Sequence, residues 1–256
     1  MRYRAIPEYY DAEYAHAEML RQDVPFLLGH LKKRQRILEL GAGTGRAAIA
    51  LAQAGHEVVG VDYDQSMLKM AQRKRDWVGV SASQLKFVKG NVLSLNLRQR
   101  FDWVCILFNT FLVFTTLKEQ DRALGAARRH LRPGAKLWID IFHPNLALLS
   151  RPHTSDLDPT MFYVPEFDRT VCRTTEVCPD PANQRQRVIF HYTWFQQDGT
   201  EMRARTEFDL TFIFPRELEV LLKRNGFSLL KLYGNYDGGR LNNDSPRMIA
   251  LCERGD

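Results

Sequence analysis

The stretch Ile37–Ala50 reads ILELGAGTGRAAIA and combines an acid, a glycine-rich turn and an alanine-rich segment. Glu39 lies inside the apolar run, and Gly41, Gly43 and Gly45 follow at alternate positions. Glycine tolerates a positive φ and places no Cβ between the backbone and a ligand. We therefore expect a buried strand, a tight turn and a helix whose first N–H groups face an anionic group.

Strands and helices alternate on both sides of this turn, and their pattern predicts the fold class. We expect strands at 37–40, 56–61, 85–88, 101–108 and 136–142, and helices at 46–54, 66–75 and 119–131. A helix at 215–225 and strands at 227–233 and 248–252 complete the set. This alternation predicts an α/β fold with a doubly wound, mostly parallel, seven-stranded Rossmann-like sheet. Ligands bind such sheets at the carboxyl ends of the strands, where the glycine turn lies.

The composition changes after the fifth strand. Residues 143–168 are rich in proline, aspartate and aromatic residues without a clear period, and β-like runs follow at 170–177, 187–196 and 202–214. In the middle run Val188, Phe190, Tyr192 and Trp194 alternate onto one face and His191 onto the other. We expect a small antiparallel β insertion at 143–214 within an α/β core, which consists of 1–142 with an N-terminal helical cap and of 215–256.

Composition and charge limit the class of protein. With 256 residues, 45% hydrophobic and 26% charged, the chain has the composition of a soluble globular protein, and we expect it in the cytoplasm. No apolar run approaches the roughly 18–20 residues that span a bilayer, and the aromatic, acidic N-terminus does not resemble a signal peptide. The four cysteines form no CxxC pair, so we expect reduced thiols and no metal. The net charge of +6 is interpreted as solvated surface, which makes a nucleic-acid partner unlikely.

Two carboxylates limit the chemical class of ligand that the pocket can bind. Asp62 ends the second strand and can accept hydrogen bonds from both hydroxyls of a ribose, so the pocket is expected to bind a nucleoside. Residues 43–48 (GTGRAA) also fit the GxGxxA variant of the dinucleotide fingerprint, which makes a nicotinamide-dependent oxidoreductase an alternative. Glu39 would place a negative charge near a pyrophosphate. It favours instead a ligand with an amino group and a positive centre.

At this point the residues resemble a known family. Residues 39–45 (ELGAGTG) and 60–68 (GVDYDQSML) are similar to those of the class I S-adenosylmethionine-dependent methyltransferases. The resemblance continues through 89–92 (KGNV), 101–104 (FDWV), 131–135 (LRPGA), 217–222 and 225–227. It implies S-adenosyl-L-methionine as the cofactor and a methyl transfer as the activity.

The resemblance also assigns a cofactor pocket. It implies that the turn 41–45 holds the methionine portion, with Glu39 near its ammonium, and that Asp62 bonds the ribose. Around the adenine and the methyl group it implies Tyr63, Met67, Asn91, Val92 and Phe108. Asn91 stands where an acid is common, and its amide oxygen can accept the same hydrogen bond.

The segment 9–16 (YYDAEYAH) is similar to leading segments that fold over the cofactor in relatives acting on small molecules. Tyr10 and Tyr14 are four residues apart and lie on one face of a helix. We expect them to present hydroxyls or ring faces to the cationic sulfonium. The insertion is similar to sheets that cover the active site in such relatives, and a homodimer interface is the alternative.

The expected reaction is an in-line displacement, in which positioning can supply roughly 7–11 kcal/mol. An amine acceptor must be neutral, whereas a hydroxyl or an acidic carbon needs a base. The candidates for that base are His143, Tyr192 and His191. Asn109 is expected near the methyl group. Residues 109–112 read NTFL, so the Asn/Asp-Pro-Pro-aromatic motif of enzymes that methylate amino groups on nucleic acid or protein is absent. The paired cysteines used to methylate a pyrimidine carbon are absent too. Both absences favour N- or O-methylation of a small-molecule acceptor. An RNA methyltransferase and a binding protein that kept the fold are the remaining alternatives.

Overall fold

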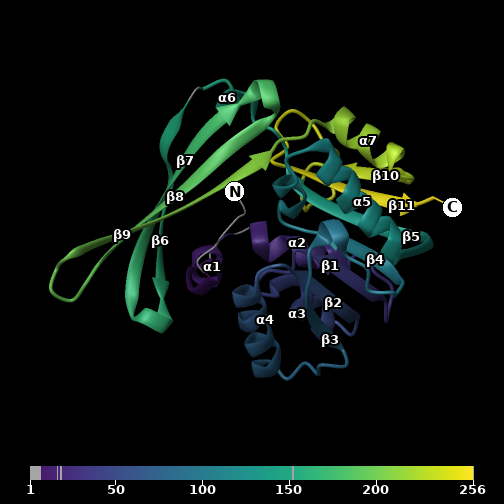
Figure 1. Cartoon of the computed structure of the whole chain (residues 1–256), viewed down its shortest axis with the longest axis horizontal. Helices are drawn as coiled ribbons and strands as arrows, with labels where there is room; N and C mark the ends of the chain where they lie inside the picture. Colours follow the sequence, from purple (N-terminus) through teal and green to yellow (C-terminus); the bar gives the residue numbers. More distant parts are fainter. Residues whose placement is uncertain (1–6, 16, 18, 152, 256) are drawn as a thin grey trace. The chain divides into compact units, whose positions relative to one another are not determined.

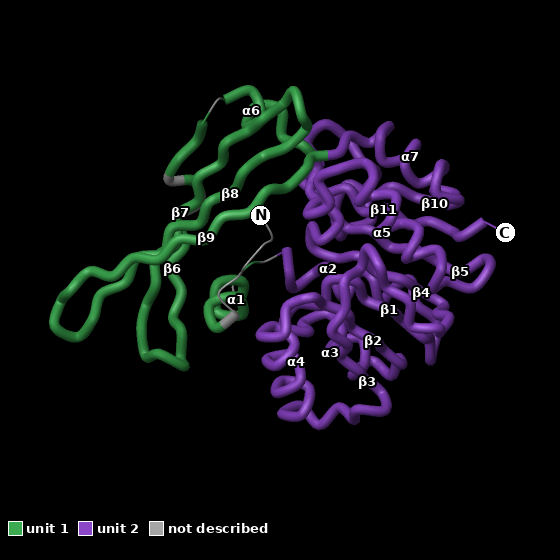
Figure 2. The backbone as a smooth tube through the Cα atoms, in the orientation of Figure 1, with its two compact units in different colours: residues 1–18, 144–212 green, residues 19–143, 213–256 purple. Residues whose placement is uncertain are grey.

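Residues 7–15, 17, 19–151 and 153–255 are described by the computed structural model, and they divide into two units (Figure 2). Unit 1 consists of residues 1–18 and 144–212, and unit 2 of residues 19–143 and 213–256. The chain enters the inserted part of unit 1 directly after His143. The division made from the sequence joined the N-terminal segment to the core, whereas the structure groups it with the insertion.

Unit 2 contains a seven-stranded sheet in the order β10-β11-β5-β4-β1-β2-β3 (Figure 1). The strands are β1 (Arg36–Leu40), β2 (Glu57–Asp62), β3 (Leu85–Lys89), β4 (Phe101–Ile106), β5 (Leu131–Phe142), β10 (Phe227–Tyr233) and β11 (Arg247–Arg254). Only β11 runs antiparallel to its neighbours β5 and β10 in this sheet. The strand order reverses at β1, so its carboxyl end is the switch point. The predicted fold class is confirmed.

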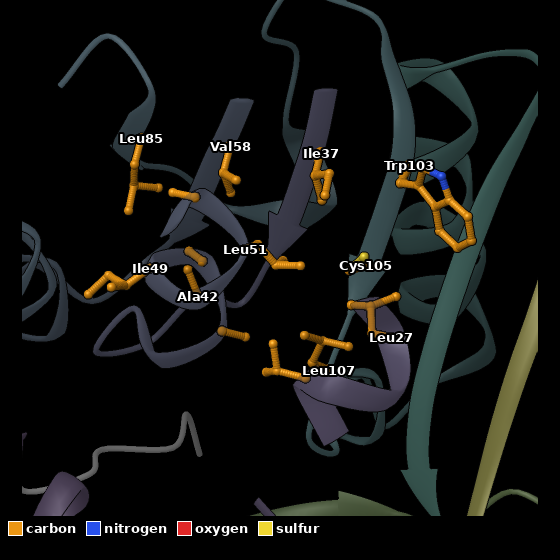
Figure 3. Close-up of a cluster of buried hydrophobic side chains, with 14 of the residues drawn as sticks. Leu27, Ile37, Ala42, Ile49, Leu51, Val58, Leu85, Trp103, Cys105 and Leu107 are labelled. Carbon is orange, nitrogen blue, oxygen red and sulfur yellow. The ribbon is translucent and has the colours of Figure 1, made fainter. Parts of the chain in front are cut away.

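Helices cover both faces of this sheet. They are α2 (Met19–Leu28), α3 (Arg46–Gln53), α4 (Gln65–Trp77), α5 (Leu117–His130) and α7 (Pro215–Arg224), with the short 3-10 helices η1 (Val92–Ser94) and η2 (Thr110–Val113). The buried side chains of α2, α3 and α4 join one core cluster with alternate strand residues such as Ile37 and Val58 (Figure 3). The helices α5 and α7 contact each other and pack on the other face, where Leu38 is buried.

Local sequence signals explain where several of these helices begin. Asp64 caps α4, and its side chain accepts a hydrogen bond from the backbone N–H of Ser66 at 2.8 Å. Thr116 and Glu119 form a reciprocal capping box at the start of α5. Gly45 precedes α3 with a left-handed φ of 78°. The side-chain caps of α4 and α5 satisfy N–H groups that a helix start leaves without partners.

Two of the strand boundaries that differ from the prediction have a clear physical cause. Strand β4 ends at Ile106 and not at Phe108, because Phe108 and Asn109 have positive φ values of 46° and 67°, which end an extended strand. Strand β5 begins at Leu131, where a helix end was expected, because Leu131 pairs with Phe101 of β4. A register shift in that ladder accommodates the intervening proline and glycine, which the sequence indicated as a stop signal.

Unit 1 contains an antiparallel four-stranded sheet in the order β6-β7-β8-β9. Its elements are α1 (Pro7–Tyr14), α6 (Leu146–Leu149), β6 (Thr154–Val164), β7 (Arg169–Asp180), β8 (Arg185–Phe195) and β9 (Glu201–Thr211), with 3-10 turns η3 (Pro165–Phe167) and η4 (Pro181–Asn183). Three strands were predicted, and the region thought to lack a period contributes β6. Two register shifts between Thr154 and Thr160 disrupt its alternation. Proline is tolerated within β6 because β6 is an edge strand.

Across the described part of the chain, no helix has the length and apolar character needed to cross a membrane.

Candidate active site

The three glycines of the opening turn have different neighbours. Gly41, Gly43 and Gly45 have φ values of 81°, 52° and 78°. A Cβ at Gly41 would collide with Thr110, and one at Gly45 would lie 2.6 Å from the Phe87 ring. At Gly43 no atom of the described residues lies within 4 Å of an added Cβ. Two glycines are therefore required by packing, and Gly43 leaves open space beside the backbone.

Asp62 connects this turn to the end of β2. One carboxylate oxygen accepts the Gly43 N–H at 2.8 Å and the other accepts the Asp64 N–H at 2.9 Å. Burial raises the pKa of Asp62, and these backbone hydrogen bonds oppose that rise. A carboxylate has about four lone-pair positions, so Asp62 keeps acceptor capacity for a further hydroxyl.

Glu39 is a buried acid with an unsatisfied oxygen. Its residue is 3% exposed, and Oε2 has no hydrogen-bond partner among the described residues. Burial raises the pKa of Glu39 to about 8, although the positive charge of Arg46 and a backbone hydrogen bond from Ala48 lower it. Leaving a buried acceptor unpaired costs roughly 1–3 kcal/mol. The oxygen is thus suited to a cationic donor from a ligand.

Arg46, the first residue of α3, forms an ion pair that the sequence did not predict. Its Nη1 lies 2.8 Å from the Asp23 carboxylate and 3.1 Å from the Leu20 carbonyl oxygen, so α2 is tied to the helix that follows the glycine turn. Asp23 is buried. The partners are 23 residues apart, and no local spacing signals their contact.

The residues assigned to the adenine lie at the ends of β2 and β3. Tyr63 is 39% exposed, whereas Met67 and Val92 are buried. The Asn91 side-chain oxygen accepts the Leu93 N–H at 3.0 Å and caps η1. A carbonyl oxygen has a second lone pair, so Asn91 can still accept another hydrogen bond. Contact of these four residues with an adenine stays a prediction.

Asn109 joins the carboxyl ends of β4 and β5. Its backbone N–H donates to the Asp140 carbonyl oxygen at 3.0 Å, and its side-chain oxygen accepts the Phe142 N–H at 2.8 Å. Phe108 and Asn109 adopt consecutive left-handed conformations, each of which costs roughly 1–3 kcal/mol for a non-glycine residue. The Asn109 side-chain oxygen therefore holds the strand end that precedes His143. Its place near the transferred methyl group stays a prediction.

His143 has one ring nitrogen fixed by the backbone. Its Nδ1 lies 3.0 Å from the Ser245 carbonyl oxygen, and its backbone N–H donates to the Pro246 carbonyl oxygen at 3.0 Å. A carbonyl oxygen can only accept, so Nδ1 carries the hydrogen and Nε2 carries the lone pair. This half-buried imidazole at the end of β5 can accept a proton at Nε2.

A buried ion pair lies at the same strand ends and was also missed. Arg247 and Asp140 are 2% and 1% exposed, with Arg247 Nε 3.0 Å from Asp140 Oδ1. The Tyr236 hydroxyl donates to the other Asp140 oxygen at 2.8 Å. Arg247 pairs with Phe142 across β11 and β5, so the network fixes the strand end that carries His143. The partners Asp140 and Arg247 are 107 residues apart in sequence.

The remaining candidates belong to unit 1. The Tyr192 hydroxyl donates to Glu13 at 3.1 Å, and Glu13 also pairs with the buried Arg173. Burial and the neighbouring Glu13 raise the pKa of Tyr192, so this hydroxyl is a donor and a poor base. Tyr10 and Tyr14 do share one face of α1, with ring centroids 4.9 Å apart. The contact of these two tyrosines with a cofactor stays a prediction.

Comparison with known proteins places these features in context. Residues 37–134 match a family model described as a methyltransferase domain. The cypemycin N-terminal methyltransferase of a Streptomyces species is 30% identical over 218 residues, which cover 85% of this chain and 82% of that protein.

Two solved structures are similar along nearly the whole chain. The CcbJ methyltransferase from Streptomyces caelestis is 24% identical with a TM-score of 0.77, and the match covers 93% of this chain and 90% of that one. The sugar N-methyltransferase KedS8 from Streptoalloteichus sp ATCC 53650 is 20% identical with a TM-score of 0.75, and the match covers 100% of this chain and 95% of that one. At these identities the likeness supports the fold.

Proposed function

Because this chain belongs to the class I S-adenosylmethionine-dependent methyltransferases, we propose that it methylates a neutral amino group of a small-molecule acceptor. The observation that supports this most directly is His143, whose Nε2 can take a proton at the edge of the sheet that carries the glycine turn. Two similar proteins are named as an N-terminal methyltransferase and a sugar N-methyltransferase, which is compatible with methylation at nitrogen.

The residues present fit the cofactor. When bound, S-adenosylmethionine supplies an electrophilic methyl group on a sulfonium. The unpartnered Oε2 of Glu39 suits the ammonium of its methionine portion, and the open side of Gly43 admits that portion against the backbone. Asp62 has remaining acceptor capacity for the ribose hydroxyls, and we assign Tyr63, Met67, Asn91 and Val92 to the adenine.

The acceptor must lose a proton for its nitrogen to react. An alkylammonium has an ordinary pKa of about 10.4, as in lysine, so only about one molecule in 2,500 is neutral at pH 7. His143 Nε2 is suited to accept that proton, and the Ser245 carbonyl holds the ring in the required tautomer. Asn109 contributes by fixing the strand end before His143. The acceptor-cover role of residues 143–214 and the alternative of a homodimer interface stay predictions.

Asp62→Ala should weaken S-adenosylmethionine binding by roughly 1–3 kcal/mol, because the ribose hydroxyls lose a charged partner and Gly43 loses its tie to β2. The affinity of Asp62→Asn should lie between those of the wild type and Asp62→Ala, since its one amide oxygen can still accept the Gly43 N–H. Calorimetric titration of both variants measures this order. An unchanged affinity in Asp62→Ala would remove Asp62 from the cofactor site.

His143→Ala should lower kcat for an amine acceptor by roughly 10²–10⁴-fold while cofactor affinity stays near wild type. The assay is S-adenosylhomocysteine release with matched small acceptors that carry either an amine or a hydroxyl. The loss should shrink at high pH, where more of the amine is already neutral.

The variant His143→Gln separates the base from a structural role, because it offers a donor to the Ser245 carbonyl but no basic nitrogen. It should be as slow as His143→Ala. Full activity in His143→Gln would show that the residue only holds the strand end. Turnover of the hydroxyl acceptor and not of the amine would contradict the proposed N-methylation.

A further inference from the structure

Three potential metal ligands converge on one face of the unit 1 sheet. Glu176 and Cys178 are two residues apart on β7 and therefore point to the same face. His153 lies immediately before β6, the neighbouring edge strand. Their donor atoms all lie within 4.8 Å of one another. None of these residues takes part in the function proposed above.

The spacing of the three donor atoms is regular. Cys178 Sγ lies 3.6 Å from His153 Nδ1 and 3.6 Å from Glu176 Oε1, and the latter two atoms are 3.7 Å apart. Zinc binds sulfur at about 2.3 Å and nitrogen or oxygen at about 2.0–2.2 Å, so a tetrahedral ion separates its ligands by about 3.3–3.6 Å. A single ion can thus bind all three atoms after a contraction of a few tenths of an ångström.

We propose that His153, Glu176 and Cys178 form a zinc site on unit 1. A thiolate, an imidazole and a carboxylate are the ligand types that zinc accepts, whereas calcium and magnesium prefer oxygen alone. Three protein ligands leave the fourth tetrahedral position to water or to another ligand. His153 is about half exposed, with a side-chain value of 52%, so an ion can reach the site from solvent.

His191 on β8 is the positioning residue of this site. Its Nε2 lies 2.9 Å from Glu176 Oε2, the carboxylate oxygen that does not face Cys178. His191 pairs with Thr174, so it shares the face that carries Glu176 and Cys178. A donor to the second carboxylate oxygen fixes the orientation of the first, as is usual around metal ligands.

The surrounding charges are compatible with a cation. Arg187 and Arg205 lie near Cys178, but each pairs with its own acid: Arg187 Nε is 2.9 Å from Asp209, and Arg205 Nη2 is 2.7 Å from Glu207. The hydrogen bond from His191 lowers the pKa of Glu176, which keeps its carboxylate ionised. Burial and the Glu176 charge raise the pKa of the Cys178 thiol. The thiolate and not the thiol is the zinc ligand, so binding should release the thiol proton.

The test is a titration of the reduced, chelator-treated full-length chain with Co²⁺ and then Zn²⁺. Cobalt should bind one per chain with the sulfur-to-metal charge-transfer absorption of a thiolate ligand, and zinc should displace it. Cys178→Ser should abolish this absorption and lower zinc affinity at least 100-fold. His153→Ala should also lower zinc affinity at least 100-fold. His191→Ala should lower it about tenfold.

The matched control is Cys172→Ser, because Cys172 is the other cysteine of β7 and has no part in the cluster. It should bind as wild type does. Each variant is checked for its melting temperature without metal, which separates loss of the site from loss of the fold. Absence of the charge-transfer band in the folded wild-type chain, or an unchanged band in Cys178→Ser, would overturn the proposal. S-adenosylmethionine binding is independent of either outcome.

Discussion

Gly43→Val should weaken S-adenosylmethionine binding at least 100-fold, about 2.7 kcal/mol, in a protein that still folds. No atom of the described residues lies within 4 Å of a Cβ added at Gly43. The Cβ of a valine therefore meets no atom of the described residues, and its side chain projects toward the proposed place of the methionine portion. Calorimetric titration measures the loss, and circular dichroism checks the fold.

Gly79→Val provides the matched control. Gly79 follows α4, has a φ of 73° and is also surrounded by open space. Both substitutions force a branched residue into the left-handed region, at a cost of roughly 1–2 kcal/mol. Only Gly43 lies in the proposed pocket, so Gly79→Val should bind normally. Equal losses in both variants would assign the effect to backbone strain and not to the ligand.

Gly41→Ala differs from both Gly43→Val and Gly79→Val, because its new methyl group collides with Thr110 inside the folded protein.

The turn itself could be predicted from the sequence, but the separate roles of its glycines could not. Three alternating glycines after a strand predicted the turn, and that prediction depended on neighbours along the chain. Which glycine serves packing and which leaves room for a ligand depends on Thr110 and Phe87, both more than 40 residues away.

The same physical limit explains the other misses. Asp64 and Thr116 cap their helices through residues two or three positions ahead, so local reading located α4 and α5 well. The ion pairs Arg46–Asp23 and Arg247–Asp140 join segments that are distant in sequence, so no helix or strand periodicity predicts them. Strand β6 escaped detection because its irregular register hides the period-two pattern.

The candidate site contains features that the local sequence predicts and contacts that depend on distant segments. Asp62 was chosen from its place at the end of the second strand, and its role toward a ribose stays a prediction. Its hydrogen bond to Gly43 appears only in the fold. Tyr192 was chosen because it alternates with other aromatic residues, and it is indeed buried on that face. Its partner Glu13 lies 179 residues earlier in the chain, so its use as a donor could not be predicted.

Glu39→Gln should remove a pH dependence of stability from the ligand-free protein. Burial raises the folded-state pKa of Glu39 from an ordinary 4.5 to about 8. Below about pH 4.5 the carboxyl is neutral in both states, and its contribution is fully present. As pH rises toward 8 the unfolded chain loses the proton and the folded chain keeps it, so stability falls, and it levels once the folded carboxyl ionises.

The size of this effect is several kcal/mol at most, at about 1.36 kcal/mol for each unit of pKa difference. Glutamine is neutral throughout, so the variant should lack this decline and be the more stable protein at pH 9. Denaturant unfolding at pH 5, 7 and 9 without ligand measures it. Glu57→Gln is the control, because Glu57 is a surface acid at the start of β2 and its removal changes the net charge equally.

Cofactor binding should reverse this preference for the protonated acid. An ammonium at Oε2 favours the carboxylate, so the pKa of Glu39 falls on binding and the complex releases close to one proton at pH 7. Affinity should rise with pH up to about 8 and then level, whereas Glu39→Gln should bind about 10- to 100-fold more weakly at pH 8 without that release. Calorimetry in two buffers of different ionisation enthalpy counts the protons. Equal proton release by Glu39→Gln and the wild type would show that the ammonium does not bind at this acid, because the release would then come from groups that both proteins share, such as Asp62.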